Sequence, residues 1–225
     1  AVFIMIYGRP NKNLTYNTLK RQGYTGDIYL VGDNTDKTIQ EYKKKFDCEI
    51  VVFDKKKVSK KMDTGDNTGD LRSTLFSANT IFKIAKKKGY EYFFIFCDDY
   101  RDFSFKFNEK FIYKQRVVRN LDKVFNILLN YYKKTNIKSI AFAQGGDFIG
   151  GNDAQIIQEG IKMKRKAMNT FLCSIKRPFQ FVGRLNEDVS TYVNLGSKGD
   201  LFFTIPNISV TQMPTLKTKG GLSDV

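Results

Sequence analysis

The sequence predicts an α/β fold, a mixed and mostly parallel sheet flanked by helices, followed by an irregular α+β C-terminal part. Two observations predict it. Short apolar runs alternate with helical patterns through the first hundred residues, as in parallel sheets that are covered by helices. The 225 residues are 41% hydrophobic and 14% aromatic, with only 4 Pro, so the chain can bury a substantial core. We expect one domain over residues 1–225.

The first half reads as strands and helices in alternation. The apolar run Val2–Tyr7 is ended by the turn signal Gly8-Arg9-Pro10, as a buried strand should be. Gly23 and Gly89 each follow a stretch of helical spacing and end it. The strands that we expect are 2–7, 27–31, 49–53 and 92–96, and the helices are 14–21, 37–46 and 71–88.

Between the third strand and the third helix lies a polar segment, residues 54–70. It contains the run KKKVSKK and carries the tripeptide TGD twice, at Thr64–Asp66 and Thr68–Asp70. Segments of this composition run over the surface of a domain. We therefore expect a mobile surface loop here.

The second half is less regular. One apolar stripe predicts a helix over 116–133, and IKSIAFA predicts a strand over 137–143 that opens into a glycine-rich loop, Gly145–Gly151. Beyond about residue 165 we expect shorter strands at MNTFLCSI, FQFVG, LFFTIP and ISVTQ, with one helix over 186–195. This part is expected to pack beside the parallel sheet.

The charge and the missing residue types narrow the function classes. Lys and Arg number 38 against 23 Asp and Glu, a formal net charge of +15, which favours a polyanionic partner. There is no His, which excludes Ser/His/Asp triads, Cys/His nucleophiles and His-bound zinc. The 3 cysteines are far apart, so we expect neither a disulfide framework nor a CxxC metal site, and a cytoplasmic, reducing location. No apolar run approaches the length of a membrane span.

The strongest candidate site is Asp98-Asp99. These carboxylates follow the strand YFFIF directly, at the strand end where ligands bind in open α/β sheets. Carboxylate oxygens are hard ligands that suit Mg²⁺ or Mn²⁺. The alternative is an ordinary turn, since Asp is common where strands end.

Two further motifs have both a structural and a functional interpretation. Asn186-Glu187-Asp188 begins a predicted helix, where Asn is a good N-cap and acidic residues complement the helix dipole. The functional alternative makes Asp188 a general base. The loop Gly145–Gly151 allows close approach of backbone to a ligand, but it matches neither GxGxxG nor a Walker A loop, which favours a plain turn.

Basic runs occur at 55–61, 86–88, 162–166 and 217–219. Most such runs are solvated faces, although the overall charge predicts salt-dependent binding to any negatively charged polymer. The aromatic residues lie mainly in apolar strands and are expected in the core. Phe103, Phe105, Phe107 and Phe111 alternate as on a half-exposed strand, and either stack on a base or sugar or pack beneath the acidic loop.

Taken together these segments resemble nucleotide-sugar glycosyltransferases of the GT-A fold, and more closely the TET-associated group, which includes the base J glucosyltransferases and many phage-encoded relatives. The resemblance spans most of the chain. The segments that carry it are IYGRP, YTGDIYLVGDN, the helix with Arg72 and Asn79, GYEYFFIFCDDY, QGGDFIGG, FVGRLNEDVSTYV and KTKGGLSDV.

The resemblance implies a role for individual residues. Tyr7, Gly8, Arg9 and Pro10 would contact uridine diphosphate, Asp33 the nucleoside, Arg72 the diphosphate, Asp98 a sugar or ribose, and Asp99 the divalent metal, Mn²⁺ or Mg²⁺. Gly145 and Gly146 would border the acceptor pocket. Asn186-Glu187-Asp188 is similar to the xED element, in which the Asp is the catalytic base of inverting enzymes and Glu187 stands beside it. Residues 1–100 would then form the nucleotide-sugar half and 101–225 the acceptor half.

The chain departs from its relatives at two points. They typically have three acidic residues where this chain has Cys97-Asp98-Asp99, and a late His that often completes their metal site is absent here. The metal site is thus expected to be poorer in ligands, and to be completed by the nucleotide sugar or replaced in part by Lys and Arg.

The expected function is transfer of a hexose, glucose from UDP-glucose, to the hydroxyl of a 5-hydroxymethylated pyrimidine in DNA, with inversion. One rival keeps the enzyme class but takes a glycan or protein acceptor. Another is a non-catalytic nucleic-acid-binding module on a degenerate transferase fold, with Cys97 marking the degeneration.

Overall fold

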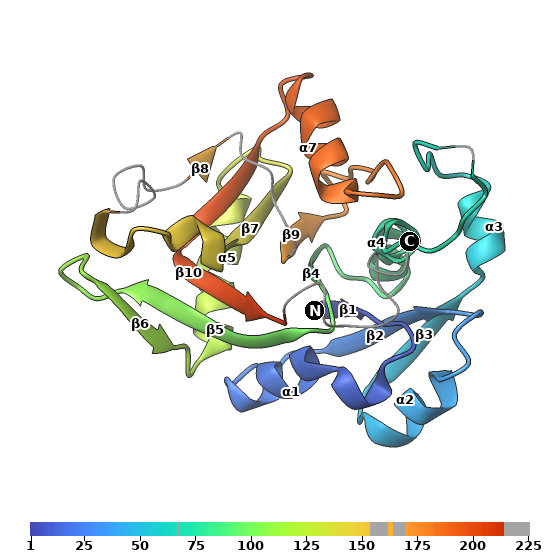
Figure 1. Ribbon diagram of the computed structural model, residues 1–225, viewed down its shortest axis with the longest axis horizontal. Coiled ribbons are helices and arrows are strands. Elements are labelled where there is room, and N and C mark those ends of the chain that lie inside the picture. Colours follow the sequence, from blue (N-terminus) through green and yellow to red (C-terminus); the bar gives the residue numbers. More distant parts are fainter. Residues whose placement is uncertain (67, 154–161, 164–169, 214–225) are drawn as a thin grey trace.

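One sheet runs through the whole computed structural model, which describes residues 1–66, 68–153, 162–163 and 170–213 (Figure 1). Its strand order is β3-β2-β1-β4-β9-β7-β10-β5-β6, and β8 pairs with β10 beside this path. The strands are β1 (Val2–Met5), β2 (Ile28–Asp33), β3 (Glu49–Phe53), β4 (Tyr92–Phe96), β5 (Tyr100–Phe107), β6 (Tyr113–Val117), β7 (Ser139–Gln144), β8 (Lys162–Met163), β9 (Phe171–Ser174) and β10 (Phe202–Gln212). The mixed α/β fold class is therefore confirmed.

The first four strands are parallel and lie side by side. β1 is in the centre of this group, paired in parallel with β2 and with β4, and β2 pairs in parallel with β3. Their carboxyl ends consequently meet at one edge of the sheet. The connections carry η1 (Pro10–Lys12), α1 (Leu14–Arg21), α2 (Ile39–Lys45), α3 (Lys55–Ser59) and α4 (Leu75–Lys87).

Helices cover both faces of the sheet and bury a core on each. On one face α1, α2 and α5 (Leu121–Lys133) pack their apolar stripes against strand residues such as Phe94 and Phe96. On the other face α4 packs with Phe3 and Phe93, and with Phe181 from the segment before α7 (Glu187–Gly196). Figure 1 shows α1 and α2 on one side of the strands and α4 and α7 on the other. The aromatic strands were therefore correctly expected in the core.

The second half adds antiparallel pairings. β9 pairs antiparallel with β4 and β7, and β5 pairs antiparallel with β10 and β6. LFFTIP and ISVTQ, expected as two strands, form the single long β10, which continues through Pro206 with an irregular register against β7. Two short 3₁₀ turns, η2 (Gly145–Phe148) and η3 (Gly151–Asp153), occupy the glycine-rich loop.

Several expected elements differ in the structure. Segment 54–70 is not only a loop, because Asp54 accepts a hydrogen bond from the Lys57 backbone N–H and caps the short α3. The helix expected from 116 begins at 121, because 113–117 pair with β5 as an edge strand. FQFVG forms no strand, since the Asn79 side chain rather than a neighbouring strand binds the backbone of Phe181. Residues 168–169 of MNTFLCSI lie outside the described part, and 171–174 are a strand.

The helix expected over 186–195 is α7, and the strand expected over 137–143 is β7. Among the helices of the described residues, none is long and apolar enough to cross a membrane.

Candidate active site

The loops after β1, β2 and β4 meet at the carboxyl edge of the parallel strands, and there Arg9 contacts Asp98. The Arg9 Nη2 atom donates to Asp98 Oδ1 at 2.6 Å, across 89 positions of sequence. Helix α1 fixes the acidic loop from the other side, because the backbone N–H of Leu14 donates to the Asp98 carbonyl at 2.8 Å. The predicted Arg9 and Asp98 are thus brought together by the parallel topology.

Asp98 and Asp99 lie in a buried position that is unfavourable for charge. Asp98 is 2% exposed, and burial raises its pKa to about 7, with Asp99 adding to the rise and Arg9 opposing it. Burial also raises the pKa of Asp99, against the Arg9 charge. Asp98 Oδ2 and Asp99 Oδ1 are buried, and no hydrogen-bond partner meets them within the described chain. Buried oxygens without a donor favour the approach of a cation.

These two oxygens fit a divalent ion that is shared with a substrate. Hard carboxylate oxygens suit Mg²⁺ and Mn²⁺, and Mg²⁺ is commonly held by one or two carboxylates together with substrate phosphates and water. Within the described residues, no group of three or more His, Cys, Asp or Glu side chains converges as a metal cage. A bound metal would therefore take its other ligands from a diphosphate.

The second acidic motif reaches the same place. The charges of Asp99, Asp98 and Glu187 all help to raise the pKa of the Cys97 thiol, after its burial, which is the largest cause. Cys97 is consequently within electrostatic range of both the acidic loop after β4 and Glu187 at the start of α7.

Within the second pair the two carboxylates have different surroundings. Glu187 accepts a hydrogen bond from the Thr74 hydroxyl, and burial raises its pKa, with Asp188 adding to the rise. Asp188 Oδ1 accepts the Val189 backbone N–H at 2.8 Å, and no described residue donates to its other oxygen. Asn186, at φ 53°, turns the chain into the helix. Asn186 occupies the N-cap position but its side chain makes no capping hydrogen bond, so the expectation that Asn186 caps the helix is wrong, and Asp188 Oδ2 is left for other chemistry.

A buried arginine connects α7 to the loop before α4. Arg184 is 4% exposed, and it contacts Asp66 at 2.8 Å and Asp70 at 3.2 Å. These are the acidic residues of the two TGD tripeptides, and the repeat is explained by their shared partner. The Ser73 hydroxyl also donates to the Arg184 carbonyl at 2.8 Å. The loop therefore fixes the segment that carries Glu187 and Asp188.

The predicted Arg72 is at the edge of this network. Its side chain is 59% exposed and contacts Asp70 at 2.8 Å, and that carboxylate is also bound by Arg184. Hydrogen bonds from Arg72 lower the pKa of Asp70 to about 2. Arg72 therefore lies close to Glu187 along the loop, but its guanidinium is held by Asp70.

The predicted nucleoside residue Asp33 lies at the end of β2 in an internal ion pair. Its Oδ2 contacts Lys55 Nζ at 2.8 Å, with both side chains buried, and its Oδ1 accepts from Thr35. Lys55 also lies over the Tyr7 ring, 4.7 Å from the centroid. Both oxygens of Asp33 are thus occupied, while Tyr7 is 41% exposed.

The other residues after β1 are fixed by their backbone. The Gly8 N–H donates to Asp36 at 2.9 Å, and Gly8 has φ 65°, a conformation that suits glycine. Pro10 is buried at the start of η1. The segment Tyr7–Pro10 therefore has a defined shape beside Asp98.

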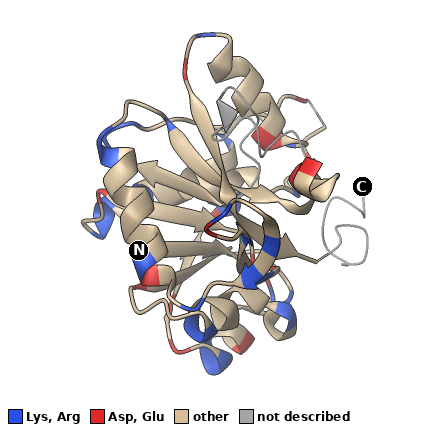
Figure 2. Cartoon of the chain, turned by 90° about the vertical axis from the view of Figure 1, so that its left-hand side faces the viewer, with Lys and Arg blue, Asp and Glu red and all other residues tan. Residues whose placement is uncertain are grey.

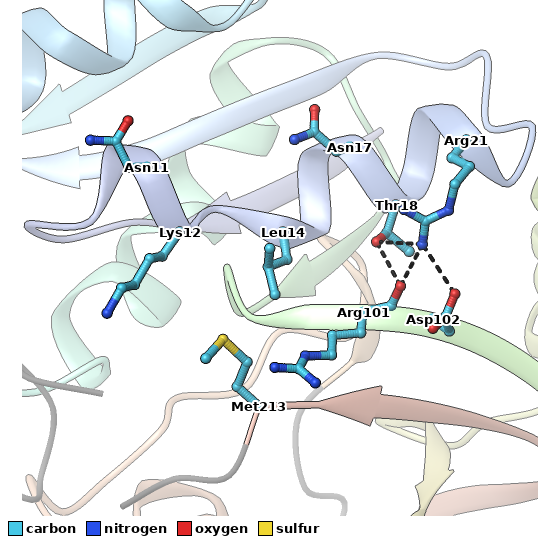
Figure 3. Close-up of a pocket in the computed structure, with 9 residues that line it drawn as sticks. All are labelled: Asn11, Lys12, Leu14, Asn17, Thr18, Arg21, Arg101, Asp102 and Met213. Carbon is cyan, nitrogen blue, oxygen red and sulfur yellow. Dashed lines mark hydrogen bonds and ion pairs between the residues drawn. The ribbon is translucent and has the colours of Figure 1, made fainter. Parts of the chain in front are cut away.

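Two cavities lie on the acceptor side of the acidic loop, and Met213 lines both. The larger, about 560 Å³, is lined by α1 and the start of β5 and carries Lys12, Arg21 and Arg101 (Figure 3). Its one acidic residue, Asp102, pairs with Arg21 at 3.0 Å. The smaller, about 290 Å³, is lined by Gly145 and Gly146 and the end of β10. The Met213 N–H donates to the Asp99 carbonyl at 3.2 Å, so both cavities adjoin the acidic loop.

Sequence patterns missed three residues of this site, Lys55, Thr74 and Arg184. Lys55 belongs to a basic run that was interpreted as solvated, although the parallel register Asp33↔Phe53 places it next to Asp33. The two TGD tripeptides were a signal for a shared basic partner, but nothing in the spacing identified Arg184.

A family model described as TAGT, TET-Associated Glycosyltransferase, matches residues 1–221. The chain belongs to this family. It is a nucleotide-sugar-dependent glycosyltransferase of a group associated with TET (hydroxymethylpyrimidine) systems, and the resemblance drawn from its segments is confirmed.

Solved structures give more distant similarities. A putative nucleotide-diphospho-sugar transferase from Desulfovibrio desulfuricans G20 has 9% identity and a TM-score of 0.49, over 97% of this chain and 87% of that one. Glucosyl-3-phosphoglycerate synthase from Mycobacterium tuberculosis, in complex with Mn²⁺, UDP and phosphoglyceric acid, has 9% identity and a TM-score of 0.47, over 95% and 70%. No match was found among curated proteins. The family assignment rests on the family model alone.

Proposed function

We propose that this TET-associated glycosyltransferase moves glucose from UDP-glucose to the hydroxyl of a 5-hydroxymethylated pyrimidine in DNA, with inversion. The observation that carries the proposal is that Asp98-Asp99 and Glu187, the neighbour of Asp188, lie within electrostatic range of the same residue, Cys97. One pair suits a cation and a diphosphate, and the other has a carboxylate oxygen open to an acceptor. Transfer of the sugar from donor to acceptor needs both acidic pairs.

Residues 1–100 are the proposed donor half. Tyr7, half exposed beside Lys55, offers an aromatic face to the uracil. Gly8 and Pro10 belong to the same loop, and their backbone is the proposed contact with the uridine diphosphate. Asp33 supports this half indirectly, by fixing Lys55 under Tyr7. Asp98 takes the sugar or ribose, and Arg9 offsets its charge.

Asp99, with Asp98 beside it, is the proposed holder of Mn²⁺ or Mg²⁺. The ion, when bound, would offset negative charge on the leaving diphosphate. Arg72 offsets charge on the same diphosphate after it leaves Asp70, and the charge of Arg9 acts on both Asp98 and Asp99. Because Cys97 replaces an acidic residue, the chain supplies fewer anionic ligands than its relatives.

Asp188 is the proposed base. Its free oxygen accepts the proton of the acceptor hydroxyl while the hydroxyl oxygen attacks the anomeric carbon. The bond from that carbon to the diphosphate breaks, and the diphosphate leaves with the electron pair. Attack from the side opposite the leaving group inverts the anomeric configuration. Glu187, fixed by Thr74, keeps the start of α7 in place.

The acceptor is assigned to residues 101–225, with Lys12 of the donor half beside them, and the charge of the whole chain favours DNA. The net charge is +15, and the larger cavity beside the acidic loop presents Lys12 and Arg101, for which no described residue supplies a carboxylate. Cationic side chains in a hollow suit a phosphodiester. Gly145 and Gly146 line the smaller cavity, where a base extruded from the duplex has room beside the backbone.

The test is transfer of labelled sugar. UDP-glucose and other nucleotide sugars, with and without Mn²⁺, would be offered with hydroxymethylated DNA, unmodified DNA, a glycan panel and a protein. The proposal predicts product only with hydroxymethylated DNA. Transfer to a glycan or a protein instead would show that DNA is not the acceptor. Binding to DNA without turnover of any nucleotide sugar would favour a non-catalytic module.

A further inference from the structure

The β5–β6 hairpin projects from the sheet and has a tip that the proposed catalysis does not use (Figure 1). The tip exposes two large apolar side chains, Phe111 at 68% and Ile112 at 48%. Phe111 has φ 56°, a left-handed conformation that is strained for a bulky residue. Exposed apolar surface and backbone strain both cost stability, so their combination at one residue points to a binding role.

The tip is rigid in spite of its exposure. Asn108 accepts the backbone N–H groups of Lys110 and Ile112 through Oδ1, at 3.0 and 2.9 Å, and the Phe111 N–H through its carbonyl at 3.0 Å. The Asn108 N–H in turn donates to the Ile112 carbonyl at 3.0 Å. These bonds hold the Phe111 backbone in its strained conformation, so that Phe111 is presented in a fixed position.

The hairpin is also anchored to the acceptor side. The Tyr113 N–H donates to Asn152 at 2.6 Å, and the rings of Phe107 and Tyr113 lie about 6 Å from that of Phe148, at 6.0 and 6.1 Å. Phe148 belongs to η2, whose glycines line the smaller cavity. The hairpin and the proposed base pocket are therefore parts of one packed unit.

Positive charge surrounds the apolar tip. Lys110, Lys114, Arg116 and Arg119 lie between residues 108 and 119, against one acid, Glu109, and all five side chains are exposed. No described carboxylate pairs with the first three. Figure 2 looks at the molecule from the side on which the hairpin projects and shows Lys and Arg there.

We propose that this hairpin is a duplex-DNA arm, in which Lys114 and Arg116 contact the phosphate backbone and Phe111, with Ile112, enters the minor groove as an apolar wedge. The inference rests on the proposed DNA acceptor. Proteins that bind the minor groove use basic side chains beside apolar wedges of this kind. Charged residues also protect an edge strand from pairing with another chain, but that role explains neither the exposed Phe111 nor its strained backbone.

The geometry sets the distance between arm and reaction. β5 starts directly after Asp99 and has 8 residues, which at about 3.3 Å each span roughly 25 Å. This corresponds to about seven base pairs of B-form duplex. A duplex that runs along β5 from the site would meet the tip about seven base pairs from the target base, so the arm is not assigned to the gap left by that base.

The test uses full-length protein on two hydroxymethylated duplexes. The long duplex has more than about ten base pairs on each side of the target base, and the short duplex has about four on each side. The variants are Phe111→Gly, which suits the left-handed backbone, and the double change Lys114→Gln with Arg116→Gln. Controls are Ile127→Ala, also exposed, and Lys43→Gln with Lys44→Gln on α2. If the hairpin is a DNA arm, the hairpin variants should have a KM for the long duplex roughly tenfold higher than that of the wild type. Their KM for the short duplex and their rate of UDP-glucose hydrolysis should be unchanged.

Binding to unmodified long duplex, followed by fluorescence anisotropy at several salt concentrations, separates the two proposals. The lysine and arginine changes are expected to reduce the salt slope by about 0.9 for each lost contact. If the variants show this reduced salt slope but the wild type transfers no glucose, the proposed DNA-modifying function is wrong and the proposed DNA arm stands. The proposal of a DNA arm would be overturned if both hairpin variants had the KM and salt slope of the wild type. It would also be overturned if the only change in the Gln variant were dimerisation.

Discussion

The two acidic pairs of the site are similar in sequence and opposite in environment. Asp98-Asp99 follows a buried parallel strand, faces Arg9 and contains two buried oxygens without a donor in the described structure. Glu187-Asp188 begins a helix, where one carboxylate binds Thr74 and the other binds the adjacent backbone. The first pair has the features of the proposed cation site, and the second has both carboxylates held in a set orientation.

Position in the fold, more than residue type, determines which chemistry we propose for each acidic pair. Parallel strands bring Asp98 and Asp99 to the edge where the loops of a nucleotide site converge. The second pair is fixed near this edge by contacts with the loop before α4, in which Arg184 binds both TGD tripeptides and Thr74 binds Glu187.

The largest effect is expected from Asp188→Asn. Loss of the proposed base should lower kcat by about 10²–10⁴-fold, because the amide cannot accept the proton. Donor binding should be unchanged, since the proposed partner of Asp188 is the acceptor hydroxyl. Steady-state kinetics and UDP titration measure the two quantities, and Asn194→Ala on the exposed part of α7 is the control. Retained turnover in Asp188→Asn would remove Asp188 from the mechanism.

Asp99→Asn is expected to act on the first pair alone. Replacing a carboxylate ligand should weaken Mn²⁺ affinity at least about a hundredfold, so the extra thermal stabilisation that Mn²⁺ gives to the UDP complex should disappear. Stabilisation by UDP without metal should persist. Thermal melts with UDP, Mn²⁺ and both would measure this. If Asp99→Asn responds to Mn²⁺ as the wild type does, Asp99 is not a ligand.

Arg184→Ala is expected to weaken the connection between the two pairs. It leaves Asp66 and Asp70 without their buried partner and should lower Tm on the order of 5 °C. Arg72→Ala removes an exposed partner of the same Asp70 and should change Tm far less. Arg184→Lys should recover part of the loss. Equal Tm values for the Arg184 and Arg72 variants would show that the TGD loops are not fixed in this way.

The smallest effect concerns the pH dependence of stability at Glu187. Burial raises its pKa above 4.5, so the folded protein retains this proton after the unfolded chain has released it. Stability from this group is therefore present at low pH and declines as pH rises through the folded pKa. Glu187→Gln has no such loss, and its Tm relative to wild type should rise as the pH increases above about 4, where the unfolded Glu side chain begins to lose its proton. A constant difference would contradict the raised pKa.

Much of this fold could be predicted from the sequence where one local signal decided the structure. Buried parallel strands are continuous apolar runs, and both acidic pairs stand next to strong strand or helix signals. The edge strand β6, YKQRV, is largely exposed and has no apolar face that could identify it. β10 continues through Pro206, a residue that normally ends a strand.

The site was predictable to the same extent. Asp98 and Glu187 could be proposed because one follows a strand signal and the other begins a helix signal, and Arg9 was proposed from the family resemblance. The partners Lys55, Thr74 and Arg184 were not, because each depends on a contact between distant segments: Arg184 and Asp66 are 118 residues apart. Long-range ion pairs leave no periodicity in the sequence. The predicted nucleoside contact Asp33 also remains a prediction, now with Lys55 as its partner.

The most direct test of the central claim is the product itself. Hydroxymethylated duplex DNA would be incubated with UDP-glucose and Mn²⁺, digested to nucleosides and analysed by mass spectrometry, with wild type and Asp188→Asn in parallel. The account predicts that wild type adds one hexose to the hydroxymethylpyrimidine, in the anomeric configuration opposite to that of the donor, and that Asp188→Asn adds essentially none. Unmodified pyrimidine after incubation with wild type, or equal product with both proteins, would contradict it.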